Sequence, residues 1–599
     1  MPTLEQAFHR LFPRHPRTKS PFDFPPLLPA DLFAYCGYLL DVSGAYHHIS
    51  PVTAIPTPTA DKALLVSDAY ATNVRDIGRS WLDNRDGKRW LPLPPPAVVE
   101  MWAELGRHAD QPLVAPDQAS AIPTWWTIAL GLFAIADEAS INIGFAGGNP
   151  FYAPVLSSYQ QQGLSASSLS RLPVSPTSIS TANVNIVCVL PKSRTPSVGC
   201  TLRSLSHNLA LLPPRGVVRT RWIASPFDQT PVGRESIEPT TRSGFDIGLM
   251  LIPFPFAVED AAFCPHISPL QPELGWFSMN PTWFPARSDS AKRRQLLKYI
   301  LGLIEAAEAA GEEVNGIVLP ELAIDHAFLS YLGRELGKNP KIDFIIAGLH
   351  DNKEGEPRNT VAIVPLFLKG DQGARISKGW EELLLTREKH HRWKIDTPQA
   401  ETYQLKGLRP PAAASAAGSA SFDWWEKIDI RSRRLDMLVY RGLTTITTLI
   451  CEDLARVDPC QQVLRAIGPN LVVALLMDGP QLRDRWSGRY AASLADDPGS
   501  SVLSFTSYAL IARQNQFSEF PDSQAVALWK DEASGTKVID LPRNADAIVL
   551  RLKGVIKQES TLDGRPDGYN SHRWQLVGQN TIAAPRGTCP AWVVSGNAR

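Results

Sequence analysis

Short runs of aliphatic and β-branched residues alternate with longer segments of helical periodicity through the second half of the chain. The runs at 245–254, 317–319, 343–349 and 443–450 have the length and composition of buried strands. Between the first two, apolar positions at 291–311 recur with a period of 3.6 residues, which predicts a helix. Strands that alternate with helices predict an α/β fold.

The first 240 residues show a less regular pattern. Helices are predicted at 97–106 and 125–137 and a strand at 183–190, which indicates a mixed α/β region. The most apolar window, 122–136, is too short to span a bilayer easily, so we interpret it as a buried helix. Around 229–243 the sequence becomes polar and rich in turn residues, and we place a domain boundary there.

A chain of 599 residues exceeds what one hydrophobic core usually holds. We therefore predict a separate N-terminal region of unknown function at 1–240, an α/β domain at 244–556, and an unassigned tail at 557–599. Within the α/β domain, an alanine-, serine- and proline-rich insertion at 409–421 predicts an exposed loop.

Composition excludes several classes of protein. Lys+Arg and Asp+Glu both total 60, so the chain has no general electrostatic reason to bind nucleic acid or an anionic membrane. The seven cysteines are scattered, without a CxxC or Cys/His ligand spacing, which argues against a disulfide framework and a structural zinc site. The first 20 residues lack the apolar segment of a signal peptide. A cytoplasmic location, with no membrane or nucleic-acid partner, is therefore expected.

Candidate chemistry lies where three of the predicted segments end. Cys451 directly follows the run 443–450 and precedes Glu452, and Glu321 ends the apolar stretch that begins at 315. Lys389 lies between them in sequence, among polar and aromatic neighbours. Open α/β sheets carry their chemistry at strand ends, although a lone buried cysteine can equally be a small core residue.

A carboxylate, an ammonium and a thiol can together cleave an unactivated carbon–nitrogen bond. The thiol must lose its proton in order to attack, and a carboxylate can accept that proton and later activate water. A lysine cation favours the thiolate and stabilises the oxyanion of the tetrahedral intermediate.

These residues resemble the motifs of the nitrilase superfamily, the carbon–nitrogen hydrolases. Leu-Pro-Glu-Leu at 319–322, Lys-His-His at 389–391 and Leu-Ile-Cys-Glu-Asp at 449–453 occur in the family's order. The resemblance implies that Glu321 is the general base, Lys389 the cation and Cys451 the nucleophile. It also implies an α-β-β-α sandwich, with two sheets face to face, over about 244–556. It further implies a small-molecule amide as substrate, no cofactor or metal, and a possible homo-oligomer.

The family has a second glutamate that orients the lysine, and Glu401 is the candidate here, although it lies further from Lys389 than the family pattern places it. Glu452 is a second candidate supporting residue, and the alternative interpretation is that it begins a helix, where an acidic side chain suits the helix dipole. Lys394 competes with Lys389, but the Lys-x-His pattern selects Lys389. The interval from Lys389 to Cys451 exceeds that typical of the family.

The predicted function is thiol-dependent hydrolysis of a non-peptide carbon–nitrogen bond, of the amidase type, through a thioester. Two alternatives stay open: a non-catalytic binding or regulatory protein on the same fold, and an acyltransferase that forms amides with the same triad. The phosphate-binding loop Gly-x-x-x-x-Gly-Lys-Ser/Thr and the Ser-Gly-Gly-x-Asp-Ser loop of NAD synthetases do not occur, so no ATP chemistry is expected.

Overall fold

The computed structural model shows a mixed α/β protein, which confirms the predicted class. It describes residues 2–52, 61–84, 91–113, 121–145, 149, 151, 178–196, 199, 201–212, 219–223, 245–254, 258–268, 271–366, 384–408, 422–431, 433–517, 520–568, 570–590 and 592–593. The predicted boundary segment 229–243 and the insertion 409–421 lie outside these residues.

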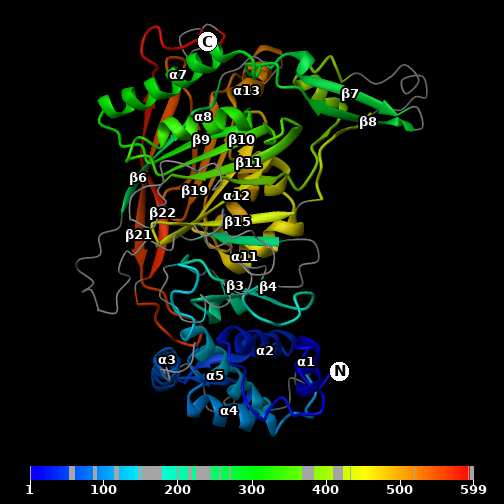
Figure 1. Ribbon diagram of the computed structural model, residues 1–599, viewed down its shortest axis with the longest axis vertical. Coiled ribbons are helices and arrows are strands. Elements are labelled where there is room, and N and C mark those ends of the chain that lie inside the picture. The colour runs from blue at the N-terminus through cyan, green and yellow to red at the C-terminus, as the bar shows by residue number, and fades with distance from the viewer. Residues whose placement is uncertain are drawn as a thin grey trace.

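Two seven-stranded sheets dominate the second half of the chain (Figure 1). The first sheet has the order β12 (Leu385–Glu388), β11 (Pro357–Pro365), β10 (Phe344–Asp351), β9 (Gly316–Ile324), β6 (Asp246–Leu251), β21 (Ala547–Lys557) and β22 (Ser571–Ile582). The second sheet has the order β20 (Gly535–Asp540), β19 (Ala525–Asp531), β18 (Ser501–Thr506), β17 (Leu471–Leu476), β16 (Thr444–Ile450), β15 (Arg434–Tyr440) and β5 (Arg219–Ile223).

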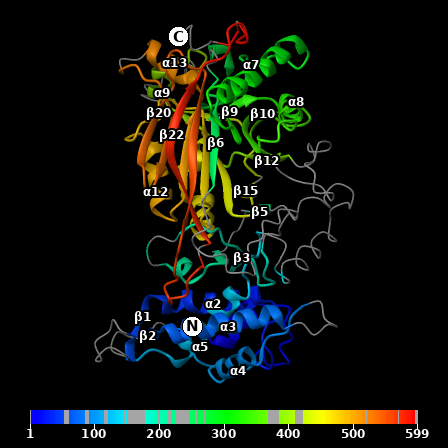
Figure 2. The ribbon, with the colours of Figure 1, turned by 90° about the vertical axis from the view of Figure 1, so that its left-hand side faces the viewer.

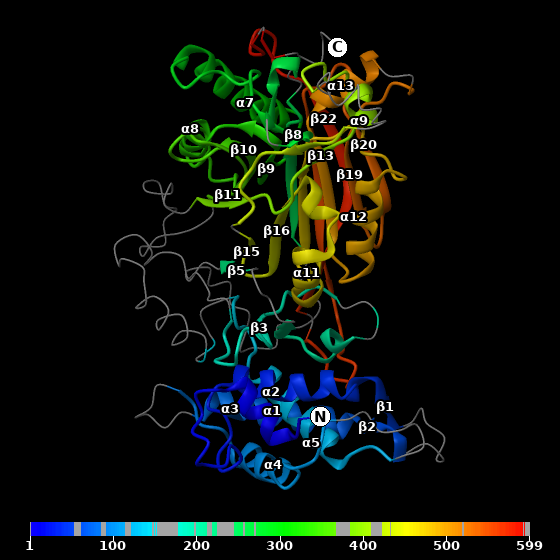
Figure 3. The same ribbon diagram turned by 90° about the vertical axis from the view of Figure 1, so that its right-hand side faces the viewer.

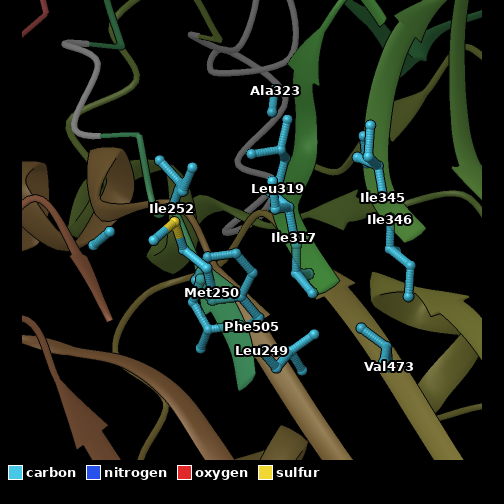
Figure 4. Close-up of a cluster of buried hydrophobic side chains, with 14 of the residues drawn as sticks. Leu249, Met250, Ile252, Ile317, Leu319, Ala323, Ile345, Ile346, Val473 and Phe505 are labelled. Atoms are coloured by element: carbon cyan, nitrogen blue, oxygen red, sulfur yellow. The ribbon is translucent and has the colours of Figure 1, made fainter. Parts of the chain in front are cut away.

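The two sheets share one hydrophobic core. Figure 4 shows Leu249 and Ile317 of the first sheet in the same cluster as Val473 and Phe505 of the second. Central strands such as β9 and β17 are buried along their whole length, which explains why they appear in the sequence as continuous apolar runs and not as alternating ones.

Helices cover the outer face of each sheet, so that the order of layers is helix, sheet, sheet, helix (Figure 3). The first sheet carries α7 (Ser290–Ala309) and α8 (His326–Leu336), and the second carries α11 (Gln462–Ile467) and α12 (Trp486–Asp496). Asp289 and Asp325 cap α7 and α8 by accepting backbone N–H groups of the first turn. The predicted helix at 291–311 is confirmed.

A smaller four-stranded sheet lies beside the two large ones. Its order is β13 (Lys394–Ile395), β14 (Trp424–Glu426), β8 (Gln271–Met279) and β7 (Phe263–Ser268), and the β7–β8 hairpin projects from the body in Figure 1. The short helices α9 (Thr397–Thr402) and α13 (Tyr508–Phe517) belong to the same half of the chain. Aromatic and aliphatic residues from the small sheet pack against Leu510 of α13 and Leu322 of β9.

The N-terminal region is mainly a helical unit with its own core. It contains α1 (Leu4–Leu11), α2 (Pro29–Val42), α3 (Asp68–Asp83), α4 (Pro96–Gly106) and α5 (Thr124–Glu138), with two small sheets formed by β1 (Ile49–Pro51) with β2 (Leu64–Val66) and β3 (Cys188–Pro191) with β4 (Leu209–Leu212). Trp125 and Trp126 are fully buried, as expected for the core of a buried helix. Among the described residues, no helix is long and apolar enough to cross a membrane.

The long hairpin β21–β22 reaches from the first sheet to the helical unit (Figure 2). At its tip, the fully buried guanidinium of Arg565 forms ion pairs with Asp137, Glu138 and Asp563. The large sheets therefore take β5 from before the predicted boundary at 240, and β22 from the predicted tail at 557–599. A domain cut at 244 and 556 would remove an edge strand from each sheet.

Candidate active site

Cys451 lies immediately after β16, at the first position of a 3-10 turn, Cys451–Leu454. Its backbone has a φ of +45°, which is costly for a residue with a side chain. The neighbouring strand β17 runs parallel, with Ile450 opposite Leu475. The strained turn therefore lifts the thiol out of the strand at the carboxyl end of a parallel pair.

Glu321 lies on a bulge of β9. The register with β10 slips between the pairs Ala347–Leu319 and Leu349–Ile324, so that β9 holds extra residues at this point. Gly348 permits the bulge because a Cβ at that position would lie 2.3 Å from the Pro320 carbonyl oxygen. A second strained backbone follows at once, since the φ of Leu322 is +56°.

Lys389 follows β12, where it is held opposite the start of β11. The Lys389 backbone N–H donates to the Asn359 carbonyl at 3.0 Å. Its ammonium donates to Glu321 Oε1 at 3.1 Å and to Glu426 Oε2 at 2.8 Å. The structure thus brings together Glu321 and Lys389, which are separated by 68 positions in the sequence.

Glu426 is the glutamate that orients Lys389, so the prediction of Glu401 for this contact is wrong. Glu426 comes from β14 of the small sheet, where it pairs with Phe277 of β8. Besides the ammonium, its carboxylate accepts the Trp393 backbone N–H at 3.0 Å. Glu401 is an exposed residue of α9, a helix that has no buried residues.

Asn359 completes the polar group and was not anticipated from the sequence. Its side-chain amide donates to Glu321 Oε1 at 2.7 Å and to Glu426 Oε1 at 2.8 Å, and thereby holds the two carboxylates on either side of Lys389. Each of these side chains is at most 4% exposed. The second oxygen of Glu321, Oε2, is buried without a hydrogen-bond partner among the described residues.

Burial and charge set the protonation of this group. Burial raises the pKa of Glu321 above its ordinary value of 4.5; the Lys389 ammonium opposes this rise and the Glu426 carboxylate adds to it. Burial disfavours the Lys389 cation, but the carboxylates outweigh it and hold its pKa well above the usual range. Burial and the Glu321 carboxylate raise the pKa of the Cys451 thiol, while Lys389 lowers it. At neutral pH Lys389 is therefore a cation and the Cys451 thiol keeps its proton.

Asp453 anchors the loop behind the nucleophile. It pairs with the buried Arg387 at 3.0 Å and accepts the His390 backbone N–H at 2.9 Å and His391 Nδ1 at 3.1 Å. Burial disfavours its carboxylate, but the hydrogen bond from His391 and the nearby cations outweigh this and hold its pKa below the ordinary 3.8. Asp453 thus ties the turn after Cys451 to the segment that carries Lys389.

The remaining candidates lie outside this polar group. Glu452 forms an ion pair with Arg456 on the helical turn. Lys394 is exposed and pairs with Asp423 at 2.7 Å. Among the described residues, no group of three or more histidine, cysteine, aspartate or glutamate residues has an arrangement that could hold a metal ion.

Nitrilase-superfamily structures are among the solved structures to which this chain is similar. An amidase of that superfamily from Nesterenkonia matches over 43% of this chain and 76% of its own, with 13% identity and a TM-score of 0.22. A CN-hydrolase superfamily protein from Xanthomonas campestris matches over 57% and 91%, with 12% identity and a TM-score of 0.24.

A glutamine-dependent NAD+ synthetase from Acinetobacter baumannii also matches, with 11% identity and a TM-score of 0.25, over 51% of this chain and only 45% of the synthetase. No protein-family model and no curated protein matches the sequence. Because the structural scores are this low, the chemistry proposed below rests on the side chains described above.

Proposed function

We propose that the protein is a thiol-dependent hydrolase of a non-peptide carbon–nitrogen bond, of the amidase type, with Glu321, Lys389 and Cys451 as its catalytic residues. The observation that carries this proposal is the Lys389 ammonium held between Glu321 and Glu426, together with the effect of the Glu321 and Lys389 charges on the pKa of the Cys451 thiol at the end of β16. The helix, sheet, sheet, helix layers agree with the sandwich implied by the sequence motifs.

In the first half-reaction, Cys451 attacks the amide carbon while its proton passes to Glu321. Oε1 of Glu321 is occupied by Lys389 and Asn359, so the unpartnered Oε2 is the acceptor. The raised pKa of Glu321 makes its carboxylate a stronger base than an exposed glutamate. The neighbouring Glu426 contributes to the raised pKa of Glu321, which favours uptake of a proton there.

Lys389 stabilises the oxyanion of the tetrahedral intermediate. An ammonium has three N–H donors, and the two carboxylates use two of them, so one remains for the substrate oxygen. Collapse of the intermediate breaks the carbon–nitrogen bond, and Glu321 returns its proton to the leaving nitrogen. The products of this half-reaction are an amine or ammonia and a thioester on Cys451.

In the second half-reaction, Glu321 removes a proton from water, which attacks the thioester carbon. The carbon–sulfur bond breaks, the acid leaves, and the proton returns to sulfur. The triad itself does not determine whether water or an amine takes the acyl group, so product analysis with an added amine distinguishes hydrolysis from acyl transfer.

The test is mass spectrometry of the full-length protein after incubation with metabolites from a cell extract. We expect an acyl adduct on Cys451 in the wild-type protein and none in Cys451→Ser. Glu321→Gln and Lys389→Met should slow formation of the adduct. Cys264 is the matched control thiol, because it is more exposed than Cys451 but lies on β7, away from the polar group.

A non-catalytic scaffold would behave differently. If iodoacetamide modified Cys264 faster than Cys451 at neutral pH, and Glu321→Gln left both rates unchanged, the proposed chemistry would be refuted. The buried Cys460 is a second internal reference, since its thiol contacts His390 Nδ1 at 2.9 Å and the charges that act on it include Asp453 and Arg387.

A further inference from the structure

The small four-stranded sheet, whose β7–β8 hairpin projects from the body in Figure 1, has two different faces. Phe277 of β8 and Trp424 of β14 lie on the inner face, where they are buried in one hydrophobic cluster. Trp276 and Trp425 alternate with them and are only partly buried, and His266 of β7 is exposed. Because successive side chains of a strand lie on opposite faces, the two partly buried tryptophans belong to the outer face.

A row of side chains crosses the outer face from one edge of the sheet to the other. Lys394 of β13 lies opposite Trp425 of β14, and Trp425 lies opposite Trp276 of β8. On the far side, Trp276 lies opposite His266 of β7. With strands about 4.8 Å apart, the row is roughly 14 Å long. Two indole rings therefore lie side by side in its middle, with a basic side chain at either end.

Cations gather around this row. The Arg392 guanidinium lies 5.3 Å from the centre of the Trp276 ring. Lys427 is exposed directly after β14, where its backbone N–H continues the pairing with β8. Lys394 forms an ion pair with Asp423, whereas Arg392 and Lys427 form none among the described residues. The two unpaired cations give the outer face a positive charge that the neutral chain as a whole lacks.

A hydroxyl group lies beside the row. Ser278 is two residues after Trp276 on β8, and therefore on the same face, and its Oγ lies 2.8 Å from His266 Nε2. A serine hydroxyl has one donor and two acceptor sites, so it can make a further hydrogen bond after this contact. Such a group suits a ribose 2′-hydroxyl, which is both a donor and an acceptor.

From this arrangement we infer that the outer face of the small sheet binds single-stranded RNA. Unpaired bases stack on aromatic side chains whatever their sequence, while nearby cations attract the phosphates. A row of roughly 14 Å accommodates about four nucleotides at about 3.4 Å each. An acidic peptide would pair with the cations but would leave the two indole rings unused. This inference does not depend on the hydrolase function proposed above.

The test is fluorescence anisotropy of a labelled uridine octamer with the full-length protein. At physiological salt we expect a dissociation constant of roughly 1–100 µM, the range of sequence-independent binding. Trp276→Ala and Trp425→Ala should each weaken binding roughly 5- to 150-fold, since each base–aromatic stack contributes a factor of that size. Trp425→Phe should retain part of the affinity, because a smaller ring still stacks.

Salt dependence separates a phosphate contact from a merely structural role. Lys427→Met should reduce the slope of log Kd against log salt by about 0.7, the value for one cation on a single strand. This variant changes an exposed side chain, so it tests the face even if the tryptophan variants do not fold.

Two controls use exposed residues elsewhere. Arg489→Met on α12 and Phe24→Ala, whose side chain is 50% exposed in the N-terminal region, should leave the affinity and the slope unchanged.

Three results would overturn the inference while leaving the hydrolase function intact. The first is absence of binding at a protein concentration of about 100 µM in low salt, and the second is binding that the variants of Trp276, Trp425 and Lys427 do not weaken. The third is equal competition by a glutamate octamer, which would show that the face attracts an acidic peptide. A deoxyuridine octamer should bind more weakly than the RNA, and Ser278→Ala should narrow this difference; equal affinities for the two octamers in the wild-type protein would refute the assignment to RNA.

Discussion

Replacement of Glu426 by glutamine is the sharpest test of the polar group, because it removes one charge and keeps the shape. Oε2 of Glu426 accepts from Lys389 and from the Trp393 N–H, while Oε1 accepts from Asn359. Glutamine has one oxygen, so whichever way it lies, its NH₂ faces another donor. If Asn359 turned to compensate, its oxygen would face Oε1 of Glu321.

The cost follows from these contacts. One charge-assisted hydrogen bond becomes a neutral one, a loss of about 1–1.5 kcal/mol, and one buried donor is left unpaired, at about 1–3 kcal/mol. If about 3 kcal/mol of this is felt in the transition state, kcat/KM falls roughly 100-fold, at 1.36 kcal/mol for each factor of ten. The Glu426 charge also contributes to the raised pKa of Glu321, so its removal lowers that pKa and weakens the base.

The assay needs no known substrate. The rate of Cys451 alkylation by iodoacetamide, followed by mass spectrometry across pH, should fall in Glu426→Gln, and its acid limb should move to lower pH. Glu401→Gln is the matched control, because Glu401 is exposed on α9 and should leave both unchanged. Equal effects of the two variants, or a Glu426→Gln rate within twofold of the wild type, would show that the orientation of Lys389 has been misassigned.

Three further predictions follow from features of the fold. Gly348→Ala should lower activity at least tenfold and the free energy of unfolding by about 1–3 kcal/mol, because the new Cβ meets the Pro320 carbonyl and displaces the bulge that carries Glu321. Activity assays and thermal unfolding, measured on the same variant, would separate the two effects. The acid limb of kcat/KM should lie above pH 4.5, because the pKa of Glu321 is raised above that value. As pH falls through the raised pKa, the base takes up a proton and activity is lost. An acid limb at or below pH 4.5 would contradict this assignment. Arg565→Met should cost about 3–5 kcal/mol in urea unfolding, since three buried carboxylates lose their cation, whereas the exposed Arg551→Met should cost little.

Local patterns predicted the strand before the nucleophile well. Cys451 directly follows β16, whose run of β-branched residues stands out in the sequence, whereas Glu321, predicted at a strand end, lies on a bulge inside β9. A run of this kind depends on neighbours in sequence, so the pattern of residues suffices to find it.

Partners brought together by the fold could not be predicted in this way. Glu426 lies beyond the insertion at 409–421, on a strand of three residues whose position depends on β8, almost 150 residues earlier. The sequence around Asn359 is that of an ordinary strand, and its contact with Glu321 depends on the pairing of β11 with β12. Strand β5 pairs with β15, which lies about 200 residues later in the chain, and β22 is the second strand of the β21–β22 hairpin. The predicted domain limits excluded both strands.

The β21–β22 hairpin has a practical consequence for dissecting this protein. A fragment that ends at residue 556 would keep all of β21 except its last residue, Lys557, but would expose the backbone N–H and C=O groups that pair with β22, and such open edges invite pairing between molecules. A fragment that keeps the hairpin but lacks the N-terminal helices would instead leave the Arg565 guanidinium without two of its three counterions. Soluble, active material is therefore expected only from chains that retain both halves.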